Sequence, residues 1–219
     1  MTNDPSTSTR GERRRARTRS RLVGAAQSLF AEQGVEATAI AAITERADVG
    51  FGSFYNHFES KEEIAEAALA EAVDAQKLAL FELIDELTDP AEVVALAHAF
   101  LVGQAIVDPT FGWLLVRLDA SHRLLIRALG GRARQDIRDG IAAGRFLTAD
   151  PEVTFFATGG ALLLVMRAVL DGDLGDDPGL RHCEGLLRML GVPEGEVADI
   201  AQRANAAVAP GAGVGDPGR

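Results

Sequence analysis

The stretch DVGFGSFYNHFESKEEI, from Asp48 to Ile64, sets two glycines, four aromatic residues and a histidine directly before a charged helix start. Its spacing predicts a short helix over 50–56 in which Phe54 faces the core, while Gly52 and Asn56 face away from it. Two glycines in one short helix cost about 1 kcal/mol each relative to alanine, so a compensating interaction is expected. A surface that approaches the helix backbone closely, such as a DNA groove, would provide it. The alternative is that the glycines only loosen a surface helix.

Two further helices are predicted ahead of this stretch. The first covers about 18–33, and Gly34 ends it where a left-handed residue is favoured. Thr38 can cap the second, a short helix that buries Ile43. The three helices together form a compact head that ends near Phe58.

The rest of the chain is also predicted to be helical. Ser60 can open a fourth helix as a capping box with Glu63, and apolar residues then recur at helical spacing without alternating β-branched runs. The predicted helices after the head cover about 60–87, 91–107, 111–119, 122–143, 152–170, 180–190 and 195–206. The fold class is therefore all-α, with four parts: a disordered basic arm over 1–16, a three-helix head over 17–59, a helical body over 60–208 and a disordered tail over 209–219.

The charge of the chain is unevenly distributed. The net charge of the 219 residues is −10. Through Lys61 there are nine basic and seven acidic residues, whereas the remainder has 13 basic and 25 acidic residues. This asymmetry is typical of a polyanion-binding head on an acidic body. A disordered basic tail without a partner would show the same asymmetry.

Cysteine content and hydropathy indicate the compartment. Cys183 is the only cysteine, so the chain cannot form an internal disulfide or a four-thiolate metal site. No apolar run follows the arginine-rich start within signal-peptide distance. The longest apolar run, Val153–Met166, is shorter than the roughly 18 residues that span a bilayer. We therefore expect a cytoplasmic protein that does not cross a membrane.

The polar groups around the third helix suit contacts with DNA. Lys61 lies in the first turn of the fourth helix, where a cation is disfavoured by about 0.3 to 1 kcal/mol unless an anion such as a phosphate is nearby. His57 and the Tyr55 hydroxyl would add further phosphate donors. Phe51 suits contact with thymine methyl groups, and Asn56 suits pairing with an adenine edge. Ser53 suits either a base or a phosphate.

Two segments carry a resemblance to a known family: AAQSLFAEQGVEATAIAAITERADV, over 25–49, and GSFYNHFESKEEI, over 52–64. With them, the chain from about Arg17 to Leu69 resembles the DNA-binding head of the tetracycline-repressor (TetR/AcrR) family of bacterial transcription regulators. The resemblance implies a helix-turn-helix made by the second and third helices. The positions that match the family's usual DNA contacts are Thr38, Ser53, Tyr55, His57 and Lys61.

Two positions depart from the family's pattern. Asp48 stands where glycine is common, and Gly50 stands where a serine or threonine cap is common. Aspartate tolerates the left-handed region better than most residues, and glycine is an acceptable cap, so the fold is expected to survive. Base readout then depends more on Phe51 and Asn56.

The resemblance also implies a role for the body. Its last long helices would pair two subunits in a four-helix bundle. The adjacent glycines 159 and 160 cost helix stability but let two helices approach closely, and a helix that is apolar all round must be covered. The predicted interface of this homodimer is Gly159, Gly160, Leu163, Leu186 and Leu190, although packing within one subunit is an alternative. Two heads spaced at about 34 Å, or a multiple, would read a palindromic operator.

The middle helices of the body are expected to enclose a pocket for a small-molecule effector. Aromatic and polar groups converge in ligand sites. The predicted lining residues are His98, Phe100, Trp113, Arg117, Phe155 and Met166, each of which also suits the core or the surface. The four histidines are scattered, so we expect no metal site and no cofactor.

The favoured function is a homodimeric, ligand-responsive repressor that binds double-stranded DNA and is released by its effector. An activator of the same fold is one alternative. A helical adaptor or membrane-surface protein that uses the arginine arm is another, although the arm lacks an apolar face before Leu22. The chain has no phosphate loop and no nucleophile elbow, so no catalytic residues and no enzymatic activity are expected.

Overall fold

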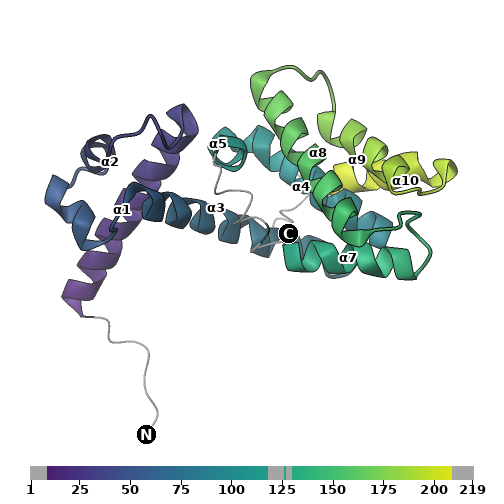
Figure 1. Ribbon diagram of the computed structural model, residues 1–219, viewed down its shortest axis with the longest axis horizontal. Coiled ribbons are helices and arrows are strands. Elements are labelled where there is room, and N and C mark those ends of the chain that lie inside the picture. Colours follow the sequence, from purple (N-terminus) through teal and green to yellow (C-terminus); the bar gives the residue numbers. More distant parts are fainter. Residues whose placement is uncertain (1–8, 118–125, 127–129, 209–219) are drawn as a thin grey trace, which may run out of the picture.

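The protein has a small head and a larger body, joined by one long helix (Figure 1). The computed structural model describes residues 9–117, 126 and 130–208, and every regular element within these residues is helical. The all-α fold predicted from the sequence is thereby confirmed. The predicted tail over 209–219 and the first eight residues lie outside the described residues.

The head consists of α1 (Arg10–Gln33), α2 (Ile40–Arg46) and the 3₁₀ helix η1 (Phe51–Asn56). Its core is formed by large side chains that are almost completely buried: Leu22, Phe30, Ile43, Phe54 and Phe58. Phe54 faces the core, as predicted, and Phe58, two residues beyond the third helix, packs against it with ring centroids 5.8 Å apart. The helix itself is a tighter 3₁₀ helix rather than the predicted α-helix over 50–56, which fits its short length and its glycine content.

The turn between α2 and η1 uses the two residues that depart from the family pattern. Asp48 has a φ of 49°, the left-handed conformation that aspartate tolerates. Gly50 precedes η1 in an extended conformation, as its N-cap. Arg21 of α1 fastens the turn, because its guanidinium donates to the Asp48 carboxylate at 2.7 Å and to the Asp48 carbonyl at 3.0 Å.

Helix α1 begins earlier than predicted. The expectation of a disordered arm over 1–16 is wrong from Arg10 onward, where the chain is already helical. The Thr9 hydroxyl accepts from the Glu12 amide at 3.2 Å, and the Glu12 carboxylate accepts from the Thr9 amide at 2.6 Å. This capping box satisfies backbone groups at the helix start without any apolar burial.

Helix α3 (Lys61–Ile84) leads from the head to the body. The Ser60 hydroxyl caps it by accepting from the Glu63 amide at 3.1 Å, as predicted. The Glu63 carboxylate, however, accepts from the amide of Glu59 rather than from that of Ser60, so the predicted reciprocal box is shifted by one residue. The helix ends at Ile84, three residues short of the predicted end.

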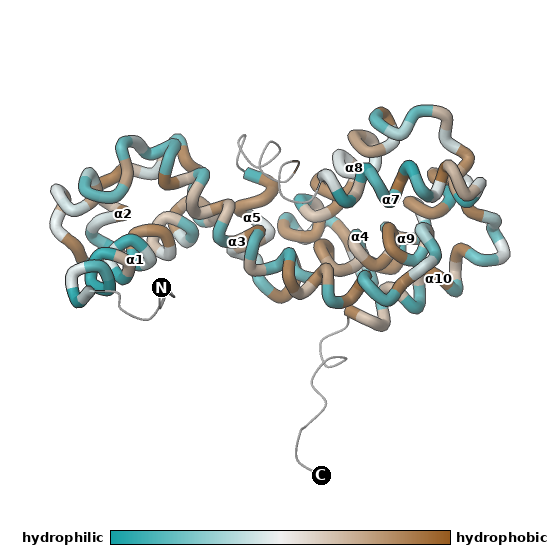
Figure 2. The backbone as a smooth tube through the Cα atoms, turned by 90° about the horizontal axis from the view of Figure 1, so that it is seen from below, coloured by the Kyte–Doolittle hydropathy of each residue, from teal (hydrophilic) through white to brown (hydrophobic). Residues whose placement is uncertain are grey.

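The body is built around α4 (Pro90–Val107), which contacts the other body helices. These are α5 (Pro109–Arg117), α7 (Gly130–Ala142), α8 (Pro151–Asp171), α9 (Pro178–Met189) and α10 (Glu194–Ala207). Figure 2 shows the hydrophobic chain gathered around α4, whereas α1 begins in hydrophilic residues. Most body helices begin at a proline, which suits the first turn, one or two residues before the predicted starts. Parts of the predicted helices over 111–119 and 122–143 lie outside the described residues.

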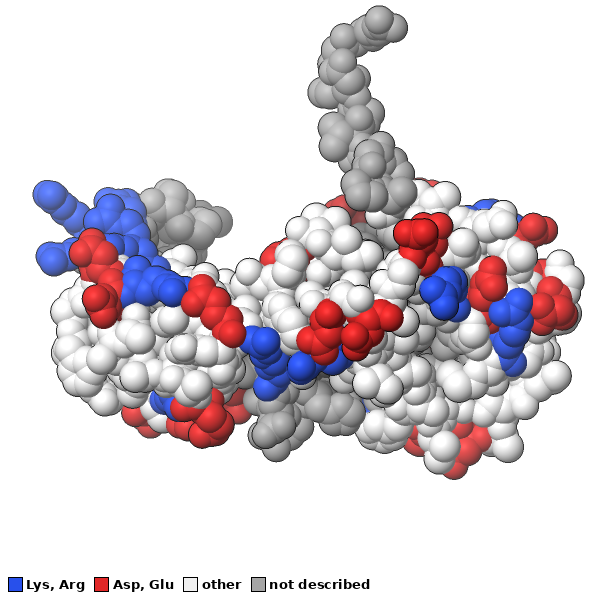
Figure 3. Space-filling model, turned by 90° about the horizontal axis from the view of Figure 1, so that it is seen from above, with Lys and Arg blue, Asp and Glu red and all other residues white. Residues whose placement is uncertain are grey.

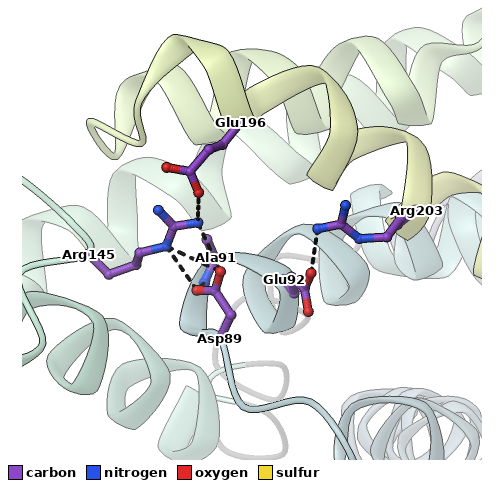
Figure 4. A network of polar contacts seen from close by, with 6 residues as sticks. All are labelled: Asp89, Ala91, Glu92, Arg145, Glu196 and Arg203. Carbon is purple, nitrogen blue, oxygen red and sulfur yellow. Dashed lines mark hydrogen bonds and ion pairs between the residues drawn. The ribbon is translucent and has the colours of Figure 1, made fainter.

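A polar network joins the start of α4, the loop after α7 and the start of α10 (Figure 4). The guanidinium of Arg145, in the loop after α7, contacts the carboxylates of Asp89 at 2.9 Å and Glu196 at 2.7 Å. Asp89 also caps α4 by accepting from the Ala91 amide at 2.9 Å. Burial opposes ionisation of Asp89, but the hydrogen bonds from Arg145 and Ala91 outweigh it, and the pKa of Asp89 is lowered. The network thus holds α4, α10 and the intervening loop in one arrangement.

Candidate nucleic-acid interface and effector cavity

The outer face of η1 presents aromatic and polar groups to solvent. Phe51 and Tyr55 are 54% and 55% exposed, and their rings meet edge to face with centroids 5.8 Å apart. Gly52 and Asn56 are exposed on the same short helix, and a Cβ added to Gly52 would meet no atom within 4 Å. Ser53 is half-buried at the edge of this face. The predicted outward orientation of Gly52 and Asn56 therefore holds, and their contact with DNA remains a prediction.

Thr38 does not have the role that the sequence predicted. The residue is only 2% exposed, and Ala39 takes the N-cap position of α2 without a side-chain cap. The Thr38 hydroxyl instead donates to the Gly34 carbonyl at 2.7 Å and accepts from the Gln33 side chain at 3.2 Å. Its hydroxyl thus forms hydrogen bonds at the end of α1 and in the loop that follows, and the buried side chain is not accessible to a duplex.

His57 and Lys61 follow η1 in the sequence. The Lys61 ammonium donates to the Glu36 carbonyl at 3.1 Å, which leaves further donors on the same nitrogen for an anion. His57 is half-buried, and burial, followed by the nearby charges of Arg15 and Arg19, lowers its pKa. A neutral imidazole at pH 7 can still donate one N–H to a phosphate oxygen.

Two arginines of α1 complete this interface, and the sequence analysis missed them as site residues. Arg15 donates to the Asn56 carbonyl at 3.2 Å, at the end of η1. Arg19 lies over the Phe58 ring, 5.2 Å from its centroid, and pairs with Glu71 of α3. The i, i+4 spacing of these arginines would have placed both on one face if the helix had been predicted to begin at residue 10.

A cavity of about 140 Å³ lies inside the body, between α3, α4, α7 and α8. Three of the predicted lining residues border it: His98, Phe155 and Met166. Most of the wall is apolar. Polar groups are contributed by Arg132 and Asp136 of α7, which the sequence analysis did not select. Their side chains are joined by a hydrogen bond of 3.1 Å, and burial, opposed by Arg132, raises the pKa of Asp136.

His98 connects this cavity with a second histidine. Its Nδ1 lies 2.9 Å from Nε2 of His182 on α9, and the two rings are stacked with centroids 5.1 Å apart. Burial, followed by the neighbouring His182, lowers the pKa of His98 to about 3, and burial lowers the pKa of His182. Both rings are therefore neutral at pH 7. Among the described residues, no group of three or more acidic, histidine or cysteine side chains could hold a metal ion.

The other three predicted lining residues lie elsewhere. Phe100 borders a separate small gap against α3 rather than the cavity. Arg117 lies over the Trp113 ring at 3.8 Å from its centroid, and its guanidinium donates to the carbonyls of Ala31 and Glu32 at the end of α1. Trp113 and Arg117 therefore belong to the joint between head and body. Sequence alone could not distinguish this joint from a pocket, since both use aromatic and charged groups.

The predicted dimer residues divide into two groups. Leu186 and Leu190 are 2% and 1% exposed, so they belong to the core of the subunit, and their assignment to an interface is wrong. Gly159, Gly160 and Leu163 border the cavity. Gly160 also lies in an exposed stripe along α8, at helical spacing with Val153, Phe156, Ala157, Leu164 and Arg167.

Two helices, α4 and α8, are long and apolar enough to cross a membrane by length and composition alone. Neither helix is an uninterrupted apolar run, because Glu92 lies in α4 and Glu152, Arg167 and Asp171 lie in α8. Helix α4 is mostly buried within the body, as a core helix is, whereas only 22% of the corresponding window of α8 is buried. The exposed apolar stripe of α8 is therefore a surface that needs a covering partner.

Comparison with known families assigns the chain. The family model of bacterial regulatory proteins of the tetR family matches residues 22–68, which contain α2 and η1. A second model, the tetracyclin repressor-like C-terminal domain, matches residues 89–203, more than half of the chain. The chain belongs to the TetR family. The helix-turn-helix implied by the resemblance is thus made by α2 and η1.

The chain is also similar to individual transcription regulators and to a solved structure. The HTH-type transcriptional repressor KstR2 of Mycolicibacterium smegmatis is 28% identical over 106 residues, 48% of this chain and 51% of the relative. The HTH-type transcriptional regulator TcmR of Streptomyces glaucescens is 33% identical over 93 residues, 42% of this chain and 41% of the relative. The chain thus matches about half the length, or less, of these curated relatives. The crystal structure of RolR with resorcinol is 36% identical and has a TM-score of 0.71, with 87% of this chain and 96% of RolR covered.

Proposed function

We propose that this TetR-family protein is a cytoplasmic, homodimeric repressor that binds a palindromic operator and is released by a small-molecule effector. The observation that carries the proposal is the exposed face of η1, where Gly52 lets the backbone approach another surface and Asn56 projects beside it. Asparagine can pair with an adenine edge, and the exposed Phe51 ring suits a thymine methyl. Ser53, Tyr55, His57 and Lys61 surround this face with phosphate donors.

The homodimer is proposed from the exposed stripe of α8. Leu164 is 71% exposed and Val153 is 64% exposed, on a helix whose inner face already borders the cavity. A second copy of the stripe would bury these side chains around a twofold axis, with Gly160 allowing close approach. The two heads would then face one duplex at a fixed distance, which is how a palindrome is read.

The effector is proposed to be a single-ring phenol or a molecule of similar size and chemistry. An apolar cavity of roughly 150 Å³ is known to hold a benzene ring, close to the cavity volume of about 140 Å³ found in this body. A ring hydroxyl can donate to the Asp136 carboxylate and accept from the Arg132 guanidinium, which are already joined. Resorcinol, the ligand in the RolR structure, is a ring of this kind.

The joint between head and body offers a route for the response. Arg167 of α8 lies over the Trp113 side chain at 4.8 Å from a ring centroid, and Arg117 lies over the same side chain and reaches the end of α1. Helix α8 borders the cavity, so a shift of α8 on effector binding would be transmitted to α1 through packed side chains. We propose that the effector favours a spacing of the heads that no longer fits the operator.

The DNA-binding part is tested by sequencing the genomic fragments that the purified protein retains. We expect retained fragments to share a palindrome whose half-sites are one helical repeat apart or a multiple of it. A retained set with no common sequence would contradict sequence-specific repression. Retained fragments that share a sequence without twofold symmetry would contradict the proposal that two heads bind one operator.

The effector part is tested with resorcinol as the probe. Trp113 is the only tryptophan, so its fluorescence reports the head–body joint directly. We expect resorcinol to change this fluorescence and to release bound DNA. Asp136→Asn should weaken resorcinol binding about tenfold, because this variant removes a charged hydrogen bond worth about 1.5 kcal/mol.

The matched control for this experiment is Asp139→Asn on the same helix, because Asp139 is exposed and bonds Gln135 instead of bordering the cavity. This control should leave the affinity unchanged. An equal reduction of affinity in both variants would contradict the cavity assignment. Absence of binding to the unmodified protein would contradict the phenol class.

A further inference from the structure

The first two turns of α1 form a basic surface of their own. Residues 10–17 are all exposed, so none of them contributes to the core of the head. Four arginines occur there at the spacing i, i+3, i+4 and i+7, which places them on one face of the helix. This arginine stripe consists of Arg10, Arg13, Arg14 and Arg17. Figure 3 shows the basic patch at the end of the molecule where α1 begins.

The charges of the stripe are not neutralised by the protein. Within the described part of the chain, the structure gives none of the four guanidinium groups an ion pair or a hydrogen bond. Glu12 lies in the same turns, but its carboxylate accepts from the Thr9 amide at 2.6 Å and caps the helix. The stripe therefore presents four positive charges along one exposed face.

This arrangement is unfavourable without an anionic partner. Arg10 and Arg14 are like charges four residues apart, as are Arg13 and Arg17, and such pairs destabilise a helix. Cations in the first turn also oppose the helix dipole. A line of negative charges along the stripe would remove both costs.

The stripe leads directly to the helix-turn-helix. Arg21 continues the same helical face one turn beyond Arg17, and it contacts Asp48 in the turn between α2 and η1. On an adjacent face, Arg15 reaches the Asn56 carbonyl at the end of η1. This extension of α1, residues 10–17, therefore lies beside the outer face of η1, at the same end of the molecule (Figure 1).

We infer that the arginine stripe binds the phosphate backbone of DNA next to the site that η1 reads. It forms a second line of phosphate contacts, outside the helix-turn-helix. Guanidinium groups bind phosphates through paired, charge-assisted hydrogen bonds. Because the extension is already helical and capped, little ordering would accompany binding. This inference rests on the proposed DNA-binding function.

The first test is the salt dependence of binding to a 30-base-pair duplex of arbitrary sequence, since phosphate contacts do not depend on sequence. Arg13→Gln/Arg17→Gln keeps the helix propensity and removes two charges. The slope of log affinity against log salt should fall by about 0.9 for each phosphate that is no longer neutralised, hence by about 1.8 for each bound subunit. Arg138→Gln/Arg188→Gln makes the same change of net charge on the body and should leave the slope unchanged.

The second test locates the contact directly. Cys183 is buried, and burial raises the pKa of its thiol to about 12, so an added surface cysteine can be labelled alone. Arg17→Cys carrying a photo-crosslinker should crosslink to the same duplex. Arg138→Cys carrying the same group on the body should not.

The outcomes separate this inference from the proposed function. A reduced slope for the stripe variant, together with crosslinking from residue 17 and not from 138, supports the inference. If the unmodified protein binds the duplex but the stripe variant keeps the full slope, or residue 17 gives no crosslink, the inference is wrong and the proposed function stands. If the unmodified protein binds no duplex, both fall.

Discussion

At the scale of single residues, the polar side chains at the cavity have no distinctive pattern in the sequence. His98 is a buried side chain whose ring is satisfied by His182, and Asp136 is half-buried beside Arg132. In sequence these residues are ordinary members of amphipathic helices, and only the packing of α7 and α9 against α4 brings them together. His98 was selected from the sequence because aromatic and polar groups converge in ligand sites. Arg132, Asp136 and His182 gave no comparable signal.

The neutral His98 ring makes stability depend on pH. Its pKa is about 3 in the folded protein and near 6.5 when unfolded, so between these values the unfolded chain binds a proton that the folded protein does not. The contribution of the neutral His98 ring to the free energy of unfolding is therefore fully present above about pH 6.5, and it is lost as the pH falls below this value. Between pH 7.5 and 5.5 we expect His98 to account for a loss of about 1.4 kcal/mol. Urea unfolding of the protein and of His98→Phe should give curves whose difference shrinks by this amount, and parallel pH dependences would contradict it.

At the scale of elements, helical periodicity predicted the body well and the ends of the head poorly. Helices α4, α8, α9 and α10 begin within two residues of their predicted starts, because apolar spacing and prolines mark them clearly. The first turns of α1 have no apolar face, and their helix is held by the Thr9–Glu12 cap instead of by burial. Predicting η1 as an α-helix was wrong, because it is a 3₁₀ helix, although the prediction that Phe54 faces the core is right.

Helix α8 gives the prediction that belongs to this scale. Leu164→Glu would place an unpaired carboxylate in the proposed interface, and burying such a charge costs several kcal/mol. We expect the dimer dissociation constant to rise at least about 100-fold, which corresponds to about 2.7 kcal/mol. Light scattering during dilution measures it. Leu78→Glu on α3, where Leu78 is similarly exposed, should leave the dimer intact; dissociation of both variants alike, or of neither, would place the interface elsewhere.

At the scale of the whole molecule, the functional parts are separated but mechanically joined. The cavity lies inside the body, the outer face of η1 lies at the far end of the head, and Arg117 with Trp113 connects α5 to the end of α1. The sequence assigned Trp113 and Arg117 to the pocket because it could not show that α5 packs against α1. Their position at the joint makes them part of the proposed route from effector to DNA.

The most direct test of the whole account is a hydroxyl-radical footprint of the protein on the operator selected from genomic fragments. Two protected half-sites on one side of the duplex, about 34 Å or a multiple apart, are predicted for a dimer that presents η1 twice. Asn56→Ala should weaken both half-sites together, by about tenfold or more in affinity, because the variant cannot pair with an adenine edge. A single protected site, or a footprint that Asn56→Ala leaves unchanged in strength, would contradict the placement of the outer face of η1 on DNA.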